Sequence, residues 1–196
     1  MEGRLSRQIE FIKEIDRLKT IVRQTYLMDA SRQENDAEHS WHITLMAWLL
    51  EEHWKESRVN ILRVMKMLLV HDIVEIDAGD TFAYDVKGQE GKWEKEQRAA
   101  ERLFGLLPED QSGELMELWL EFEQQETAEA RYAVAMDRVQ PLLHNYYTQG
   151  KAWREHKVTS DRVRERIRFL EAELPDVHAM ISGLIDDAVQ KGYLLP

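Results

Sequence analysis

The sequence contains no cysteine, which excludes both disulfide bonds and thiolate metal sites. Any metal ion must therefore be bound by histidine and carboxylate side chains. Basic residues are in the minority, with 26 lysines and arginines against 37 aspartates and glutamates and a net charge of −11. An acidic chain is a poor binder of nucleic acid polymers and anionic lipids, so we expect neither as a partner. A small anionic substrate is still compatible with a site in which a metal ion reverses the local charge.

Long apolar runs are also missing. The longest candidate, residues 43–50, is far shorter than the roughly 20 residues that span a bilayer. The first ten residues are charged and have no apolar run, so they are unlike a signal peptide. Together with the lack of cysteine, these features lead us to expect a cytoplasmic protein without a membrane partner.

Glycine and proline are scarce, with nine and four among 196 residues. Apolar residues recur at helical spacing, and no alternating pattern typical of strands is apparent. Helices are expected over about residues 5–24, 37–54, 60–72, 91–106, 108–124, 127–147, 160–173 and 176–192. Pro141 falls inside one of these segments and should kink or break that helix. The pattern predicts an all-α fold.

The segments between the expected helices are short. Residues 29–36 and 76–85 are rich in polar residues and turn formers, so we expect loops there. There is no internal repeat and no linker long enough to separate domains. We therefore expect residues 1–196 to form one compact domain, with a core over about 5–147 and a C-terminal helical extension over about 151–196.

Several ionisable residues stand at unusual places in this apolar pattern. His71 and Asp72 end an apolar helix, and Asp137 is embedded among alanine, valine and methionine. Buried charges need partners, and a divalent cation suits imidazole and carboxylate together. Each residue also has an ordinary interpretation. His39 stands at the start of another helix and can act as a cap, and Asp137 can form an ion pair with Arg138. The combination is more specific than any single residue.

In this order and spacing the residues resemble the HD-domain superfamily of metal-dependent phosphohydrolases. The family pattern is a histidine, a His-Asp pair and a distant aspartate, which correspond to His39, His71, Asp72 and Asp137. Residues 34–40 and 71–80 are similar to the small 5′-deoxyribonucleotidase-like group of that superfamily. The resemblance covers roughly residues 5–147 and implies a compact helical bundle of the HD-domain type.

The resemblance also implies that those four side chains hold a divalent metal ion. Two-metal members of the superfamily supply extra histidines between the His-Asp pair and the last aspartate. This chain has no histidine between Asp72 and Asp137, so a single metal ion is expected. Mixed histidine and aspartate ligation does not identify the metal, and manganese, cobalt, iron, nickel, zinc and magnesium all remain open.

Two further carboxylates fall on functional positions of the family. Glu75 lies one helical turn beyond His71 and is a candidate general base or water-orienting residue. Asp80 resembles the carboxylate near the leaving oxygen or the sugar. The alternative interpretations are an exposed carboxylate past the helix end for Glu75 and a cap of the following turn for Asp80.

Candidate substrate-binding residues come from the same resemblance. Arg23 corresponds to a phosphate-binding arginine, and Tyr26 is an inexact match to an aromatic residue that stacks on the nucleobase. Arg32 and Lys87 are further candidates, although each is also compatible with an ordinary surface charge. Residues 81–85 depart from the proline-rich stretch of the nucleotidase-like group, which should alter the pocket and weakens the nucleotide assignment.

Other polar and aromatic residues have less defined places. We expect His144, Asn145, Trp153 and His156 to line the pocket or an interface, and His42 to pack behind the site. A homo-oligomer, in the simplest case a homodimer, is expected, with Trp119, Phe122 and the C-terminal helices as its candidate surface.

The sequence thus predicts a metal-dependent phosphohydrolase that acts through metal-activated water. The preferred substrate is a nucleoside 5′-monophosphate or a similar small phosphorylated metabolite. Two alternatives stay open. The first is a non-catalytic or regulatory helical module with a structural metal, against which the spare carboxylates Glu75 and Asp80 argue. The second is a nucleoside triphosphate hydrolase, which would need a longer basic channel than this acidic chain suggests.

Overall fold

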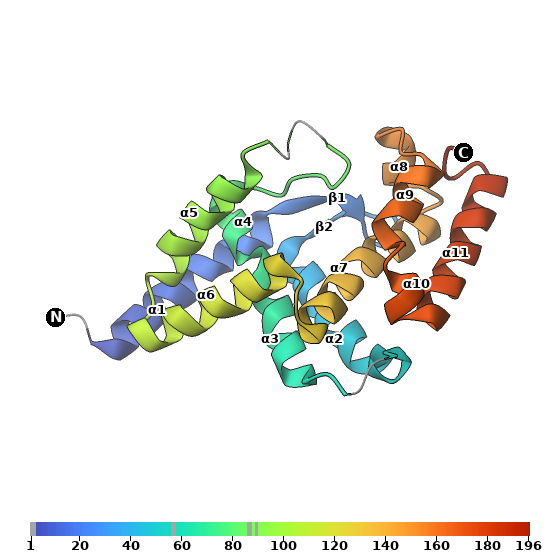
Figure 1. Cartoon of the computed structure of the whole chain (residues 1–196). Helices are drawn as coiled ribbons and strands as arrows, with labels where there is room; N and C mark the ends of the chain where they lie inside the picture. The colour runs from blue at the N-terminus through green and yellow to red at the C-terminus, as the bar shows by residue number, and fades with distance from the viewer. Residues whose placement is uncertain (1–2, 56–57, 86–87, 89) are drawn as a thin grey trace.

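The computed structural model describes residues 3–55, 58–85, 88 and 90–196, and helices dominate it (Figure 1). The helices are α1 (Arg4–Ile15), α2 (Asp36–Leu50), α3 (Ile61–Val70), α4 (Glu75–Ala78), α5 (Lys92–Phe104), α6 (Glu109–Gln124), α7 (Ala128–Tyr147), α8 (Lys151–Glu155), α9 (Ser160–Ile167), α10 (Leu170–Glu173) and α11 (Pro175–Gln190). The 3₁₀ segments are η1 (Asp16–Thr20), η2 (Glu51–His53) and η3 (His71–Val74). The strands are β1 (Val22–Tyr26) and β2 (Gln33–Asn35). The predicted helical fold class is confirmed.

The N-terminal region differs from the sequence-based expectation. The expected helix over residues 5–24 ends at Ile15 and is followed by η1 and β1. Strand β1 pairs antiparallel with β2, which lies inside the expected loop at 29–36. The prediction missed this ribbon because two short strands carry little pattern, and their stability comes from pairing and from contacts with α7 and α8.

Helix α2 begins with a capping box. The Asn35 side chain accepts a hydrogen bond from the Glu38 backbone N–H, and the Glu38 side chain accepts one from the Asn35 backbone N–H. These two contacts satisfy amide groups that a helix N-terminus leaves unpaired. The cap fixes the first turn of α2, which carries the buried side chains of Asp36 and His39.

Helix α3 is followed directly by the 3₁₀ segment η3. Its apolar face is buried, and at His71 the chain passes into η3 and then directly into α4. The expected loop over residues 76–85 therefore begins with helix, because α4 extends to Ala78. Gly79 ends α4 with φ of +79°, a conformation that glycine adopts without strain. The turn at Gly79 sends the chain back over the site at Asp80.

Helix α7 is the central buried helix, and it runs through Pro141 to Tyr147, so the expected break is wrong. Proline lacks the N–H that would bond to the carbonyl of Asp137. The Asn145 side chain donates a hydrogen bond of 2.9 Å to the Pro141 carbonyl. The neighbouring turns of α7 are buried in the core, which compensates for the missing bond.

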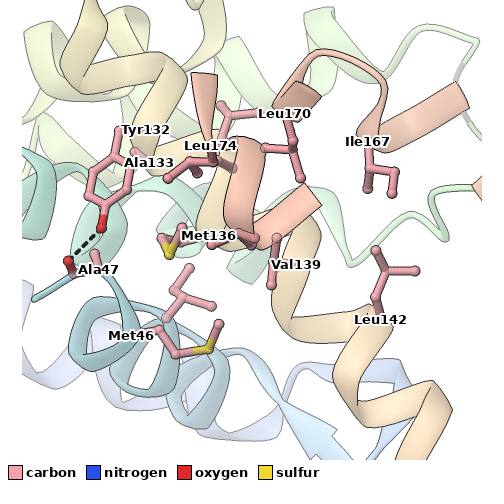
Figure 2. Packing of buried hydrophobic residues seen from close by; sticks show 14 of the residues in the cluster. Met46, Ala47, Tyr132, Ala133, Met136, Val139, Leu142, Ile167, Leu170 and Leu174 are labelled. Carbon is pink, nitrogen blue, oxygen red and sulfur yellow. Dashed lines mark hydrogen bonds between the residues drawn. The ribbon is translucent and has the colours of Figure 1, made fainter. Parts of the chain in front are cut away.

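The larger apolar core gathers around α7, with contributions from α2, α3 and the C-terminal helices (Figure 2). Within it, the Tyr132 hydroxyl donates a hydrogen bond of 2.7 Å to the Ala47 carbonyl. Trp119 and Phe122 are also buried, so the prediction that they form a dimer surface is wrong. Among the described helices, none combines the length and apolarity needed to cross a membrane.

Candidate metal centre

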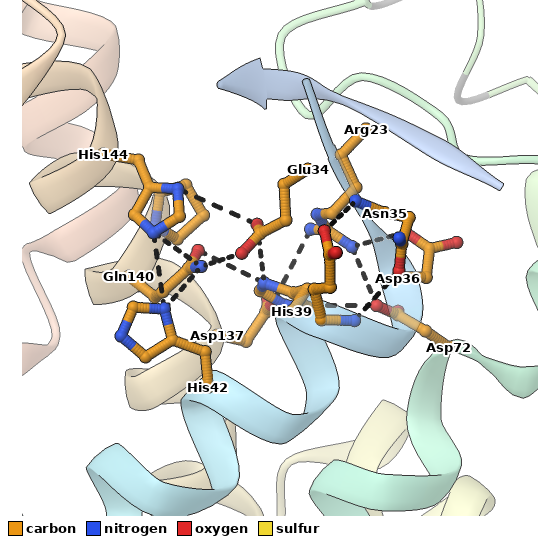
Figure 3. Close-up of polar contacts among 12 residues, drawn as sticks. Arg23, Glu34, Asn35, Asp36, His39, His42, Asp72, Asp137, Gln140 and His144 are labelled. Atoms are coloured by element: carbon orange, nitrogen blue, oxygen red, sulfur yellow. Dashed lines mark hydrogen bonds and ion pairs between the residues drawn. The ribbon is translucent and has the colours of Figure 1, made fainter. Parts of the chain in front are cut away.

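Three helical segments bring the four predicted metal ligands together. His39 comes from the first turns of α2, His71 and Asp72 from η3, and Asp137 from the middle of α7 (Figure 3). His39 Nε2 lies 3.1 Å from Asp137 Oδ1, and His71 Nε2 lies 3.1 Å from Asp72 Oδ1. The cross distances, His39 Nε2 to Asp72 Oδ2 and His71 Nε2 to Asp137 Oδ1, are both 3.9 Å. Such spacing suits donor atoms that surround one ion at about 2 Å each.

The ring of His71 has the orientation expected of a metal ligand. Its Nδ1 donates to the Leu68 carbonyl at 2.9 Å, which leaves Nε2 with a free lone pair. This Nε2 is buried and makes no hydrogen bond with any described residue. A buried nitrogen without a hydrogen bond, facing two carboxylates, fits a cation as its missing partner.

The ring of His39 is held from behind by two residues that sequence reasoning did not single out. His39 Nδ1 lies 3.2 Å from Gln140 Oε1, and Gln140 Nε2 donates to Glu34 Oε1 at 2.7 Å (Figure 3). Because an amide oxygen only accepts, the proton lies on Nδ1 and Nε2 faces the carboxylates. Gln140 follows Asp137 by three residues on α7, and this one-turn spacing was the available signal.

The electrostatics of the site favour a bound cation. Burial opposes ionisation of Asp137, but His39 outweighs it and holds the pKa of Asp137 well below its usual range. Burial likewise opposes ionisation of Asp72, but His71 and Arg23 keep its pKa well below normal. Burial and Arg23 oppose protonation of His39, yet its hydrogen bond with Asp137 and the nearby carboxylate of Glu34 raise its pKa to about 9. The position at His39 Nε2 therefore attracts a positive charge, whether proton or metal ion.

Glu75 lies beside the predicted ligands. It is buried, and its Oε2 has no hydrogen-bond partner among the described residues. Oxygen atoms of Asp36, Asp72 and Glu75 lie within 4.8 Å of one another. Burial, followed by Asp72 and Asp36, raises the pKa of Glu75 well above its usual value. Burial and Asp72 also raise the pKa of Asp36 to about 7, so Asp36 takes up or releases a proton near neutral pH.

A family model described as the HD domain matches residues 15–178. The chain belongs to the HD-domain family. This HD-domain protein is 32% identical to human 5′-deoxynucleotidase HDDC2 over 136 residues, which are 69% of the chain and 65% of the relative. It thus spans slightly under two thirds of that relative.

Two solved structures resemble the HD-domain protein. One is a Magnetospirillum magnetotacticum MS-1 protein described as a predicted metal-dependent phosphohydrolase, which is 55% identical with a TM-score of 0.93. That match covers 100% of this chain and 97% of the other. An HD-domain phosphohydrolase from Listeria innocua has a TM-score of 0.65 at 19% identity, over 94% of this chain and 99% of that one, and shares the fold.

A pocket opens beside the predicted metal ligands of this HD-domain protein. Asp80, Asp137 and Arg23 form its inner wall, and Phe82, Tyr84 and Trp153 supply aromatic surface. The segment 81–85, which differs from the proline-rich stretch of the nucleotidase-like group, thus contributes to the pocket, as the sequence suggested. Asn145 also lines it, while His156 packs on Phe82 with ring centroids 4.2 Å apart. Burial raises the pKa of Asp80 at the inner wall.

The predicted substrate-binding residues lie in different places. Arg23 reaches the centre, where Nη1 donates to Asp72 Oδ2 at 2.8 Å and to Asp36 Oδ1 at 3.2 Å. The hydroxyl of Tyr26 instead donates to Glu155, and Arg32 forms an ion pair with Glu38. Neither of the last two lines the pocket, and Lys87 is outside the described residues.

A second group of possible ligands lies behind His39. Glu34, His42 and His144 could each offer one atom to an ion. Gln140 Nε2 occupies the space among them, at 2.7 Å from Glu34 Oε1, 3.3 Å from His42 Nδ1 and 3.0 Å from His144 Nε2. One amide group thus fills the position that an ion would take, and the three residues support His39 rather than forming a separate metal site.

Proposed function

We propose that this protein is a metal-dependent phosphohydrolase that releases phosphate from a nucleoside 5′-monophosphate or a similar small phosphomonoester. The observation that carries the proposal is the buried Nε2 of His71, which faces two ionised carboxylates and makes no hydrogen bond with any described residue. The substrate class is supported by the relatives named 5′-deoxynucleotidase and by an aromatic pocket next to the centre. A purely structural metal site would need no such pocket.

In this proposal His39, His71, Asp72 and Asp137 hold one divalent metal ion. When bound, the ion lowers the pKa of water and neutralises charge on the phosphate. Arg23 holds Asp72 and Asp36 in place through its two hydrogen bonds. Gln140 keeps the proton of His39 on Nδ1. The positions of the ligating atoms are thereby fixed before substrate binds.

Glu75 is the proposed general base. Burial, Asp72 and Asp36 raise its pKa, which makes its carboxylate a stronger base toward the attacking water than an exposed glutamate. Asp80 lies at the wall shared by the centre and the pocket, where it can orient the leaving oxygen or the sugar. Phe82, Tyr84 and Trp153 offer flat apolar surface for a nucleobase.

The whole chain is proposed to act as one domain. Trp153 on α8, in the C-terminal extension, lines the same pocket as Arg23 of β1. The extension would therefore contribute to substrate binding and not only to stability.

A homodimer is proposed through the outer face of α2. Trp41, Leu45, Trp48 and Leu49 recur at helical spacing there and are 64%, 36%, 61% and 65% exposed. A helix that is apolar on all sides is normally covered, and the same patch on a second copy can cover it symmetrically.

Phosphate release tests the proposed activity. The purified protein is assayed on a panel of phosphorylated metabolites with each candidate metal ion, with and without EDTA. We expect metal-stimulated release that EDTA abolishes, and a loss of about 100-fold or more in His71→Ala. His178→Ala, a histidine on α11 remote from the centre, is the control and should keep full activity. Full activity in His71→Ala would refute the site assignment.

A further inference from the structure

Two arginines stand in the pocket beside the metal centre and play no part in the mechanism above. Arg138 follows Asp137 on α7, and Arg166 comes from α9 in the C-terminal extension. Both line the aromatic pocket, and both also line the adjoining cavity that contains His71 and Glu75. The pair therefore borders the space that leads from the centre to the aromatic residues.

In the part of the chain that the structure describes, these two side chains contact neutral groups. Arg138 Nη1 donates to the Arg166 carbonyl at 3.0 Å, and its guanidinium lies 4.9 Å from the centroid of the Phe169 ring. Arg166 lies over the ring of Tyr84 at 5.6 Å. Among the described residues, no carboxylate lies within ion-pair distance of either guanidinium. Arg23, in contrast, forms ion pairs with Asp36 and Asp72.

This arrangement is electrostatically unfavourable without an anion. Both guanidinium groups border the same pocket, and Arg138 Nη1 approaches the backbone of Arg166 rather than a carboxylate. Two like charges in a partly buried pocket repel each other, and the repulsion is removed when an anion binds between them. The chain has 37 acidic residues, yet none of the described carboxylates forms an ion pair with these two arginines. A planar guanidinium matches the oxygen atoms of a phosphate or carboxylate through paired hydrogen bonds.

The reacting phosphate does not need this pair. In the proposed function its charge is met at the metal centre, where Arg23 also lies. Arg166 is supplied by α9, whereas the metal-binding side chains come from α2, η3 and α7. We propose that Arg138 and Arg166 form a subsite for a second anionic group, a phosphate or a carboxylate, carried by the same substrate. This inference rests on the proposed hydrolase function and narrows its substrate class to phosphomonoesters with a second negative group.

Matched substrate pairs test the subsite and separate its two possible ligands. Adenosine 5′-monophosphate is compared with adenosine 3′,5′-bisphosphate, and glycerol 3-phosphate with 3-phosphoglycerate. We expect the wild-type kcat/KM to be about tenfold higher or more for the doubly anionic member of at least one pair, as one charge-assisted hydrogen bond predicts. A preference in the first pair identifies a phosphate, and one in the second identifies a carboxylate.

Variants then assign that preference to the arginines. Arg166→Gln should remove about tenfold from kcat/KM on the preferred doubly anionic substrate and stay within about twofold on its singly anionic partner. Arg138→Lys, which keeps the charge, should retain part of the preference. Arg164→Gln is the control, because this arginine lies on the same helix but pairs with Asp186 at the surface. Circular dichroism checks that each variant is folded.

Two results would overturn the subsite. One is a wild-type enzyme with equal kcat/KM on both members of each substrate pair. The other is an equal loss of kcat/KM on both members in Arg166→Gln, which would assign the two arginines to the reacting phosphate. If no substrate is hydrolysed, the proposed function fails, and calorimetry still tests the subsite. Arg166→Gln should then weaken pyrophosphate binding to the metal-loaded protein about tenfold and leave inorganic phosphate within about twofold. Unchanged pyrophosphate affinity would contradict the subsite.

Discussion

Gln140 links His39, a predicted metal ligand, to a buried carboxylate. Its Oε1 accepts from His39 Nδ1, and its Nε2 donates to Glu34, so a single amide sets the direction of the imidazole. We predict that Gln140→Leu weakens metal affinity by about 10- to 100-fold, as loss of a partner behind a ligating histidine usually does. Competition with a chelating dye measures the change. Gln124→Leu, at an exposed position, serves as the control, and unaltered affinity in Gln140→Leu would argue against this role.

A substitution at Glu75 can distinguish the proposed catalytic step from metal binding. Its buried carboxylate has a raised pKa, and its Oε2 has no hydrogen-bond partner among the described residues, which suits a base. The predicted metal ligands are four other residues. We predict that Glu75→Gln lowers kcat by about 10²- to 10⁴-fold and leaves the bound metal unchanged. Stopped assays and metal analysis of the same sample provide the two values. Loss of the metal in this variant would make Glu75 a ligand instead.

The residues that the sequence could identify are those whose type and order are unusual. His71 and Asp72 end an apolar helix, Asp137 lies in an apolar run, and the structure brings these residues together with His39. The sequence did not single out Gln140, Arg138 or Arg166. A neutral amide and two arginines are common residues, and only the fold brings them next to the candidate site. Their functional contacts join segments up to about a hundred residues apart, which no local pattern records.

At the scale of elements, the N-terminal cap of α2 couples helix stability to the metal centre. The capping box of Asn35 and Glu38 fixes the turn that carries His39. We predict that Asn35→Ala lowers the free energy of unfolding by about 1 kcal/mol, and that it also weakens metal binding because the first turn of α2 frays. Asn60→Ala, which removes the cap of α3 far from the centre, should cost similar stability and leave metal affinity unchanged. Urea denaturation and dye competition measure the two quantities, and equal metal affinities would contradict the coupling.

The helices were more predictable than the ribbon because periodicity over ten or more residues is a stronger signal than strands of five and three residues. Residues 16–24 continue a helical spacing, yet they lie in η1 and β1. The strand is important for the candidate site because it carries Arg23. From β1 the guanidinium of Arg23 reaches Asp72 and Asp36. Tertiary contacts outweighed local propensity there.

At the scale of the whole molecule, the apolar face of α2 leads to a prediction about assembly. Trp41 and Trp48 are both more than 60% exposed on one helix face. We predict that Trp48→Glu converts a homodimer into a monomer, because a carboxylate would be buried without a partner at the interface. Sedimentation velocity measures the mass, with Trp93→Glu, on α5, as the control. A wild type that is already monomeric at micromolar concentration would contradict the proposed dimer.

One metal ion per chain, held by His39, His71, Asp72 and Asp137 and required for phosphate release, is the feature on which the other proposals depend. Metal content and phosphate release measured on the same preparations of wild type and Asp137→Asn test it most directly. We predict one equivalent of metal and turnover in the wild type, and loss of both in the variant. Two equivalents in the wild type, or full metal content and activity in Asp137→Asn, would contradict the single four-ligand centre.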